Sequence, residues 1–233
     1  LPAIKIYTRK RKNKRMEKTI FDHIAIFIFR KFQYTRLMAL NMAKPRHFIL
    51  GNITKRLMRF GNRKMVVDSV DKLNVSEGDV VIEVGSGNGD ALCELLKRRP
   101  KKIFALEISR SFLSDLKSAF SSKNIDIIER DAKDLKDIVE NDSIDKILLI
   151  NVVYFLDPIE PYLSEFKRTL KAGGTVLITG KFTAASQMDR SVFKNTSLEE
   201  LLATAETYFD VESQFVDLGE PISQYHAIKL TKI

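Results

Sequence analysis

The feature that most constrains this chain is a glycine-rich turn that directly follows a short apolar segment. Residues 80–90 read VVIEVGSGNGD, with glycines at the alternate positions 85, 87 and 89. Glycine lets the backbone turn sharply and approach a ligand without side chains in between. In an open α/β sheet, ligands bind outside the carboxyl ends of the strands. The stretch therefore predicts an α/β fold that binds a nucleotide-like ligand at this turn.

The same stretch argues against two other glycine-rich sites. A dinucleotide-binding turn has Gly or Ala at its sixth position, where Asp90 stands here. A phosphate-binding P-loop has Gly-Lys followed by Ser or Thr, and the turn lacks these residues. The single cysteine, Cys93, excludes a disulfide framework and a cysteine-rich metal site, so we expect no bound metal. We expect Cys93 to face the sheet from the helix after the turn.

Together with the acidic residue at position 83, the turn resembles motif I of the class I S-adenosylmethionine (SAM) methyltransferases. Two more acidic residues continue the resemblance, because Glu107 ends a second apolar segment and Asp131 follows a third. In that family the first of these carboxylates binds both ribose hydroxyls. The second, with the amide of the next residue, reaches the adenine. The resemblance implies SAM as cofactor and these cofactor-binding residues: Glu83, Gly85, Ser86, Gly87, Gly89, Glu107, Ile108, Asp131, Ala132 and Asn151.

The resemblance also implies the fold. Class I methyltransferases have a Rossmann-like sheet of seven strands, the last of them antiparallel, with helices on both faces. Residues 147–150 fit the fourth strand, and LKAGGTVLI at 170–178 is similar to the family's L-K-P-G-G turn into the fifth. Residues 198–209 have helical spacing. The alternating segments 211–216 and 225–230 predict the final antiparallel pair.

Residues 51–75 precede the first predicted strand and carry apolar residues at helical spacing. Many small-molecule methyltransferases of this family fold an additional N-terminal helix over the cofactor pocket as a lid, and the resemblance implies the same role here. Gly61 and Asn62 would permit a hinge in this helix. For residues 65–75, a helix packed on the edge of the sheet is the alternative.

Basic residues are concentrated near the amino terminus. Residues 1–70 carry 18 Lys and Arg and three acidic residues, whereas the rest of the chain is net acidic. The run RKRKNKR at 9–15 is suited to bind phosphates of nucleic acid or anionic lipid, to act as a targeting signal, or to remain a solvated tail. We expect residues 1–49 to form a basic N-terminal extension, disordered or targeting, and residues 50–233 to form the methyltransferase domain. A chain starting at Met42 should then fold.

An apolar segment, IAIFIF at 24–29, is too short to span a bilayer, which needs about 20 residues. Beside the basic residues it is suited to lie on an anionic membrane surface or to belong to an organelle presequence. We expect a cytoplasmic protein, with mitochondrial and membrane-peripheral locations as the alternatives.

The residues that directly follow the fourth predicted strand indicate which kind of acceptor is methylated. Residues 151–158 read NVVYFLDP, which is similar to the methyltransferase domain 11 group of quinone, sterol-type and phospholipid methyltransferases. Asn151 and Tyr154 are also the ends of the Asn/Asp-Pro-Pro-Tyr motif by which amino methyltransferases hold a planar amine. Both prolines of that motif are absent, so nothing supports the kink that aims backbone carbonyls at an amine.

We therefore expect methyl transfer from SAM to a small, apolar or lipid-like acceptor. The alternatives are a nucleic-acid methyltransferase that uses the basic arm and a non-catalytic interaction protein with a SAM-binding fold. Fold alone does not give the substrate. The candidate catalytic residues are Asn151, Tyr154 and His226.

Overall fold

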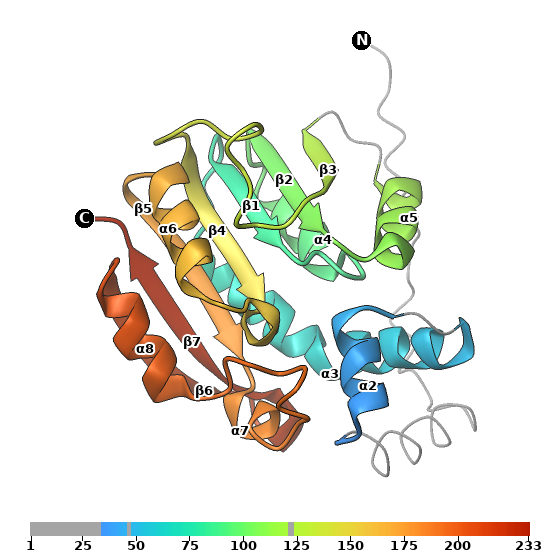
Figure 1. Cartoon of the computed structure of the whole chain (residues 1–233). Coiled ribbons are helices and arrows are strands. Elements are labelled where there is room, and N and C mark those ends of the chain that lie inside the picture. Colours follow the sequence, from blue (N-terminus) through green and yellow to red (C-terminus); the bar gives the residue numbers. More distant parts are fainter. Residues whose placement is uncertain (1–33, 46–47, 121–123) are drawn as a thin grey trace.

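The computed structural model describes residues 34–45, 48–120 and 124–233, which form one seven-stranded sheet with helices on both faces (Figure 1). The strand order is β3-β2-β1-β4-β5-β7-β6. The strands are β1 (Val80–Val84), β2 (Lys102–Glu107), β3 (Ile125–Glu129), β4 (Ile144–Ile150), β5 (Leu170–Gly180), β6 (Asp210–Asp217) and β7 (Gln224–Thr231). Strands β1 to β5 are parallel, and β7 is antiparallel to β5 and β6. The predicted seven-stranded class I fold is confirmed.

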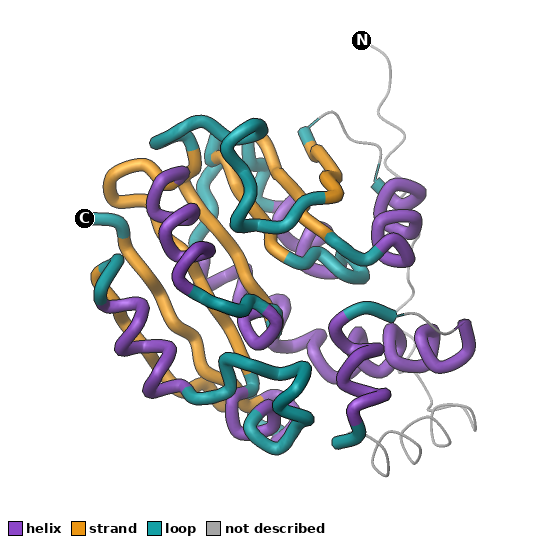
Figure 2. Tube along the Cα trace, in the orientation of Figure 1, coloured by secondary structure: helices purple, strands orange, loops and turns teal. Residues whose placement is uncertain are grey.

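Helices cover both faces of the sheet, as Figure 2 shows in purple. One apolar core lies between the sheet and α3 (Phe48–Leu73), α4 (Asp90–Lys97) and α5 (Arg110–Ala119). The other lies between the sheet and α6 (Glu160–Thr169) and α8 (Leu198–Glu206). The remaining described helices are α2 (Arg36–Ala43), α7 (Phe182–Ala185) and the 3-10 turns η1 (Val153–Phe155) and η2 (Pro221–Ser223). No helix of the described ranges is long and apolar enough to cross a membrane.

Helix α4 corrects the expectation for Cys93. The helix turns its buried side, Ala91, Leu92 and Leu95, toward the sheet, whereas Cys93 is exposed. Positions three apart lie on one side of a helix, and the residue directly after Leu92 turns away from that side. The helical phase therefore places this thiol on the surface, and the expectation that it faces the sheet is wrong.

Helix α3 is continuous through Gly61 and Asn62, so the hinge expected there is not formed. A Cβ at Gly61 would lie 3.3 Å from Cδ1 of Ile222 in η2. The glycine thus permits close packing of the helix on η2. Its intrinsic cost in a helix is only about 1 kcal/mol, which tertiary packing readily outweighs.

Helix α2 lies within residues 1–49, the stretch expected to be an extension, and it packs into the folded domain. Met38 and Ala39 are fully buried, and Met38 Sδ accepts a hydrogen bond from the Thr54 hydroxyl of α3. A chain starting at Met42 would lose these contacts, and whether it folds stays a prediction. The basic run at 9–15 and the apolar segment at 24–29 lie outside the described residues.

We predict that Met38→Ala lowers the free energy of unfolding by about 2–4 kcal/mol, because it removes a fully buried side chain and leaves a cavity. Leu37→Ala on the same helix is the matched control, since Leu37 is 52% exposed, and it should change stability by less than about 0.5 kcal/mol. Urea unfolding followed by circular dichroism measures both. Equal, small effects would show that α2 is not part of the cooperative unit.

Candidate functional site

The glycine turn is built around positive φ angles and close packing. Gly85, Gly87 and Gly89 have φ values of 70°, 49° and 72°. A Cβ at Gly85 would lie 2.5 Å from Val152 Cγ2, just after β4, and one at Gly89 would lie 2.5 Å from Phe120 Cε2. Side chains at these two positions would collide with their neighbours. The turn after β1 therefore lies directly against the exit of β4.

The Glu107 carboxylate at the end of β2 is held by three backbone amides. Its Oε1 accepts from the N–H groups of Ile108 (2.8 Å) and Ser109 (2.7 Å), and its Oε2 accepts from the N–H of Gly87 (2.9 Å). Burial raises the pKa of this carboxyl, while the three hydrogen bonds and the charge of Lys44 act in the opposite direction. A carboxylate has about four acceptor sites, and the amides use both sites of Oε1 and one of Oε2. The carboxylate is thus fixed in position, and Oε2 can still accept from a ribose hydroxyl.

A second carboxylate, Glu83, is buried near the end of β1 with one oxygen unpartnered. Neither Glu83 Oε2 nor the buried Ser86 hydroxyl has a hydrogen-bond partner among the described residues. Burial raises the pKa of Glu83 to about 8; the Ser86 hydroxyl opposes this rise, and the charges of Glu107 and Asp90 add to it. A buried carboxylate without a partner is costly. An ammonium group of a ligand would satisfy it.

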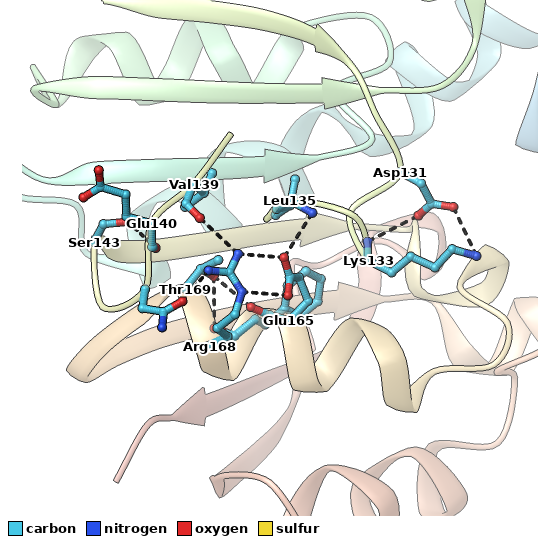
Figure 3. Close-up of polar contacts among 11 residues, drawn as sticks. Asp131, Lys133, Leu135, Val139, Glu140, Ser143, Glu165, Arg168 and Thr169 are labelled. Carbon is cyan, nitrogen blue, oxygen red and sulfur yellow. Dashed lines mark hydrogen bonds and ion pairs between the residues drawn. The ribbon is translucent and has the colours of Figure 1, made fainter. Parts of the chain in front are cut away.

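Asp131 lies just beyond β3, the strand at the far side of β2. Its Oδ2 accepts from the Tyr162 hydroxyl (3.1 Å), and Lys133 Nζ lies 3.8 Å from the same oxygen. Figure 3 shows Asp131 and Lys133 on the segment that leaves the sheet. Ala132 is buried beside it. The predicted adenine-binding pair is therefore at the same edge of the sheet as the glycine turn.

Two residues of α6 anchor the segment 130–143 that carries Asp131 (Figure 3). Glu165 Oε1 accepts from the N–H of Leu135 (3.0 Å), and the Arg168 guanidinium donates to both Glu165 oxygens and to the carbonyl of Val139 (3.0 Å). Although burial opposes it, the Arg168 contact lowers the pKa of Glu165. This buried ion pair fixes the path of the chain from β3 to β4.

Asn151, directly after β4, makes two side-chain hydrogen bonds. It has φ 55°, a left-handed conformation that asparagine tolerates. Its Oδ1 accepts from the N–H of Lys181 (3.3 Å), and its Nδ2 donates to Met65 Sδ (3.6 Å). A thioether is a weak acceptor. The amide N–H groups of Asn151 are therefore the polar donors of this exit that a ligand oxygen would engage.

The other two candidate catalytic residues are packed differently. Tyr154 is 3% exposed and its ring contacts Phe155, Phe182 and Phe193, with centroid distances of 6.3, 5.5 and 5.5 Å. Its buried hydroxyl has no partner among the described residues, and it occupies the space that a side chain at Gly180 would fill. Tyr154 thus packs in the apolar core next to the exit of β4.

His226 lies on β7 opposite Gly180, the last residue of β5. The imidazole is half-buried between the rings of Phe182 (6.0 Å) and Phe215 (5.2 Å). Burial lowers its pKa, which favours the neutral ring. The role of His226 as a base stays a prediction.

The sequence analysis did not identify Lys181, which directly follows β5. Its Nζ donates to the carbonyl of Gly61 (2.9 Å) and to Asn62 Oδ1 (2.8 Å), both on α3. Burial lowers the pKa of this lysine to about 8. The only sequence signal was its place after an apolar strand, since its partners lie 119 and 120 residues away.

Helix α3 contacts both the glycine turn and Lys181 after β5. Its Arg59 donates to Asp90 Oδ2 (3.0 Å) and to the carbonyl of Asn88 (3.1 Å), and the Asn88 side chain donates back to the carbonyl of Lys55 (3.1 Å). The helix therefore crosses from the glycine turn to the end of β5. In Figure 1 the arrowheads of β4 and β5 point toward α7, and the cyan part of α3 runs past them.

The arrangement fits the cofactor that the resemblance implies. Glu107 is a fixed carboxylate that would suit a ribose hydroxyl, and Glu83 is a buried carboxyl with an unpartnered oxygen that would suit a cationic amino group. Among residues 34–45, 48–120 and 124–233, no group of three or more His, Cys, Asp or Glu side chains is arranged to hold a metal ion.

We predict that Glu83→Gln stabilises the cofactor-free protein at pH 8 and weakens cofactor binding. The unfolded carboxyl loses its proton near pH 4.5 and the folded one near pH 8. The folded wild type therefore binds the proton more tightly and loses stability as the pH rises between these values, by on the order of 4 kcal/mol. Glutamine has no such proton, so the variant should lack this loss.

Urea unfolding at pH 5.5 and pH 8 measures the effect, and calorimetry with S-adenosylhomocysteine measures binding. Glu94→Gln on α4 is the control, because Glu94 forms a surface ion pair with Lys97. If wild type and Glu83→Gln have the same dependence on pH, the carboxyl is not protonated in the folded chain.

Comparison with known proteins finds a methyltransferase domain in this chain. Residues 82–178 match the family described as "Methyltransferase domain". The chain is 39% identical over 79 residues to the probable ribosomal RNA small subunit methyltransferase A of Pyrococcus abyssi. The aligned residues cover 32% of this chain and 29% of that protein. It is 24% identical over 153 residues to ribosomal RNA small subunit methyltransferase A of Mycoplasmopsis synoviae, which covers 66% of this chain and 57% of that protein. The aligned part of the chain thus spans less than two thirds of the length of each of these relatives.

Solved structures share the fold at low identity. A SAM-dependent methyltransferase from Archaeoglobus fulgidus has 16% identity and a TM-score of 0.61, over 76% of this chain and 98% of that one. A Haloferax volcanii structure, solved as a complex with the Trm112 methyltransferase activator, has 17% identity and a TM-score of 0.65, over 77% and 94%. The [4+2]-cyclase SpnF has 13% identity and a TM-score of 0.62, over 73% and 81%, so the fold does not by itself fix the reaction. With the strand order, these matches identify residues 82–178 as part of a methyltransferase domain with the class I SAM-dependent methyltransferase fold.

Proposed function

We propose that the chain transfers the methyl group of SAM to a small molecule with an apolar body, held between helices α2 and α3 and the ends of β4 and β5. The observation that carries this proposal is the closure of the site by the two helices. Met38, Ala39 and Met65 are fully buried there, and Lys44 at the end of α2 is close enough to act on the charge of Glu107. Such a closed, partly apolar site suits a small acceptor.

When bound, the SAM sulfonium supplies an activated methyl group and a neutral leaving group. The protein then has to align the acceptor and exclude water. Glu107 and Glu83 orient the cofactor, Asn151 offers N–H donors to the acceptor, and α3 covers the reacting atoms.

Methylation of ribosomal RNA is the second candidate, because the curated relatives carry that name. An amino methyltransferase of the Asn/Asp-Pro-Pro-Tyr type would need an accessible aromatic ring at position 154. Tyr154 is buried among aromatic side chains in this chain, and both prolines are replaced by valine. These two observations favour the small acceptor.

The proposal predicts that radiolabelled methyl groups pass from SAM into a small-molecule extract of cells, in a fraction soluble in acidified organic solvent. Purified ribosomal RNA should stay unlabelled. Glu107→Ala should lower labelling by roughly ten- to a hundredfold at limiting SAM, since hydrogen bonds to a charged group contribute about 1.5–3 kcal/mol. Glu94→Ala is the matched control and should leave labelling unchanged.

Labelling of RNA that falls steeply as the salt concentration rises would instead establish the second candidate. Labelling that is unaffected by Glu107→Ala would contradict the assigned cofactor site.

A further inference from the structure

Lys181 is a half-buried cation without an ion-pair partner among the described residues. Its two acceptors, the Gly61 carbonyl and the Asn62 side chain, are both neutral. No carboxylate of the described ranges lies within ion-pair distance of its Nζ. Removing an ammonium group from water without a counter-ion is costly. A neutral hydrogen-bond donor at position 181 could also hold α3 in place. The contacts with α3 therefore do not explain why this side chain is charged.

The Lys181 ammonium group also has one N–H that donates to no described residue. It carries three N–H donors, and the two acceptors on α3 account for two of them. The third has no acceptor in the part of the chain that the structure describes. Burial lowers the pKa of the group to about 8, so at neutral pH it still carries most of its charge.

A second donor, which has only a weak acceptor, lies next to Lys181. The Asn151 side chain accepts from the Lys181 backbone N–H and directs its own Nδ2 to the weak acceptor Met65 Sδ. Both residues thus present donors at this exit. Donors recognise oxygen atoms of a ligand, whereas an amine would need acceptors.

The strand order separates Lys181 from the cofactor-binding carboxylates. Glu83 and Glu107 belong to β1 and β2, and Asp131 follows β3, whereas Lys181 follows β5. Strand β4 lies between β1 and β5. Neighbouring strands are about 4.8 Å apart, so the end of β5 is about 10 Å from the end of β1. That distance puts Lys181 on the acceptor side of the Asn151 exit.

We infer that Lys181 binds an anionic oxygen of the acceptor, so that the substrate is a small molecule with an apolar body and a carboxylate, phenolate or enolate group. This inference rests on the proposed function and specifies its substrate class. The anion replaces the missing counter-ion and accepts the third N–H, with Asn151 Nδ2 as the second donor. Lys181 is then a residue that determines substrate specificity.

The test uses the full chain with ¹³C-labelled lysine and S-adenosylhomocysteine, and benzoate as the probe anion. The Lys181 signal is identified by its loss in Lys181→Met. Benzoate should shift this signal saturably and raise the pKa of Lys181 by about one unit, a tenfold gain in proton affinity. Benzamide has the same shape without the charge and should do neither. Lys146, a half-buried lysine that donates to the Thr175 hydroxyl at the other end of β4 and β5, should not respond.

Calorimetry separates this inference from the proposed function. Lys181→Met should keep the affinity for S-adenosylhomocysteine within about twofold and lose benzoate binding, whereas Lys181→Arg should retain both. The inference is overturned if benzoate leaves the Lys181 signal unchanged, or if benzamide shifts it equally. It is also overturned if S-adenosylhomocysteine alone raises the pKa of Lys181, because the cofactor carboxylate would then be the anion. Failure of S-adenosylhomocysteine to bind wild type would contradict the proposed function, and the benzoate titration would still test Lys181.

Discussion

The packing of helix α3 across the carboxyl ends of the strands is the contact on which the whole site depends. At one end Arg59 binds Asp90 and the Asn88 carbonyl beside the glycine turn. Toward the other end the buried hydroxyl of Ser69 meets that of Thr179 on β5, at 3.0 Å. Without the helix, Lys181 would lose its two acceptors and Asn151 its contact with Met65. One helix thus joins the cofactor end of the site to the acceptor end.

The two ends of the site have opposite charge, and each carries a desolvated group. Burial raises the pKa of Glu83 and lowers that of Lys181, so both groups are shifted toward their neutral forms. Each shift is a cost that a ligand of opposite charge relieves. SAM is cationic at its sulfonium and amino groups, which suits the end with the carboxylates. The lysine end suits an acceptor with an anionic oxygen, and groups with perturbed pKa values in one site are typical of function.

The common location of the three carboxylates could be predicted from the sequence, whereas the contacts of Lys181 could not, for a physical reason. Glu83, Glu107 and Asp131 stand at or just beyond the ends of β1, β2 and β3, and in a parallel sheet such ends meet at one edge. Lys181 is defined by contacts with a helix about 120 residues earlier, which no local pattern encodes. The continuous course of α3 through Gly61 likewise follows from packing on Ile222, and the exposure of Cys93 from the phase of α4. Local patterns fixed the strands, and tertiary contacts fixed the acceptor site.

An experimental structure of the complex with S-adenosylhomocysteine tests the central claim most directly. The account predicts that a ribose hydroxyl lies within hydrogen-bond distance of Glu107 Oε2 and that the amino group lies against Glu83. The sulfur should face the gap between Asn151 and Lys181, beneath α3. A ligand whose sulfur faces away from the end of β4, or whose ribose does not contact Glu107, would contradict it.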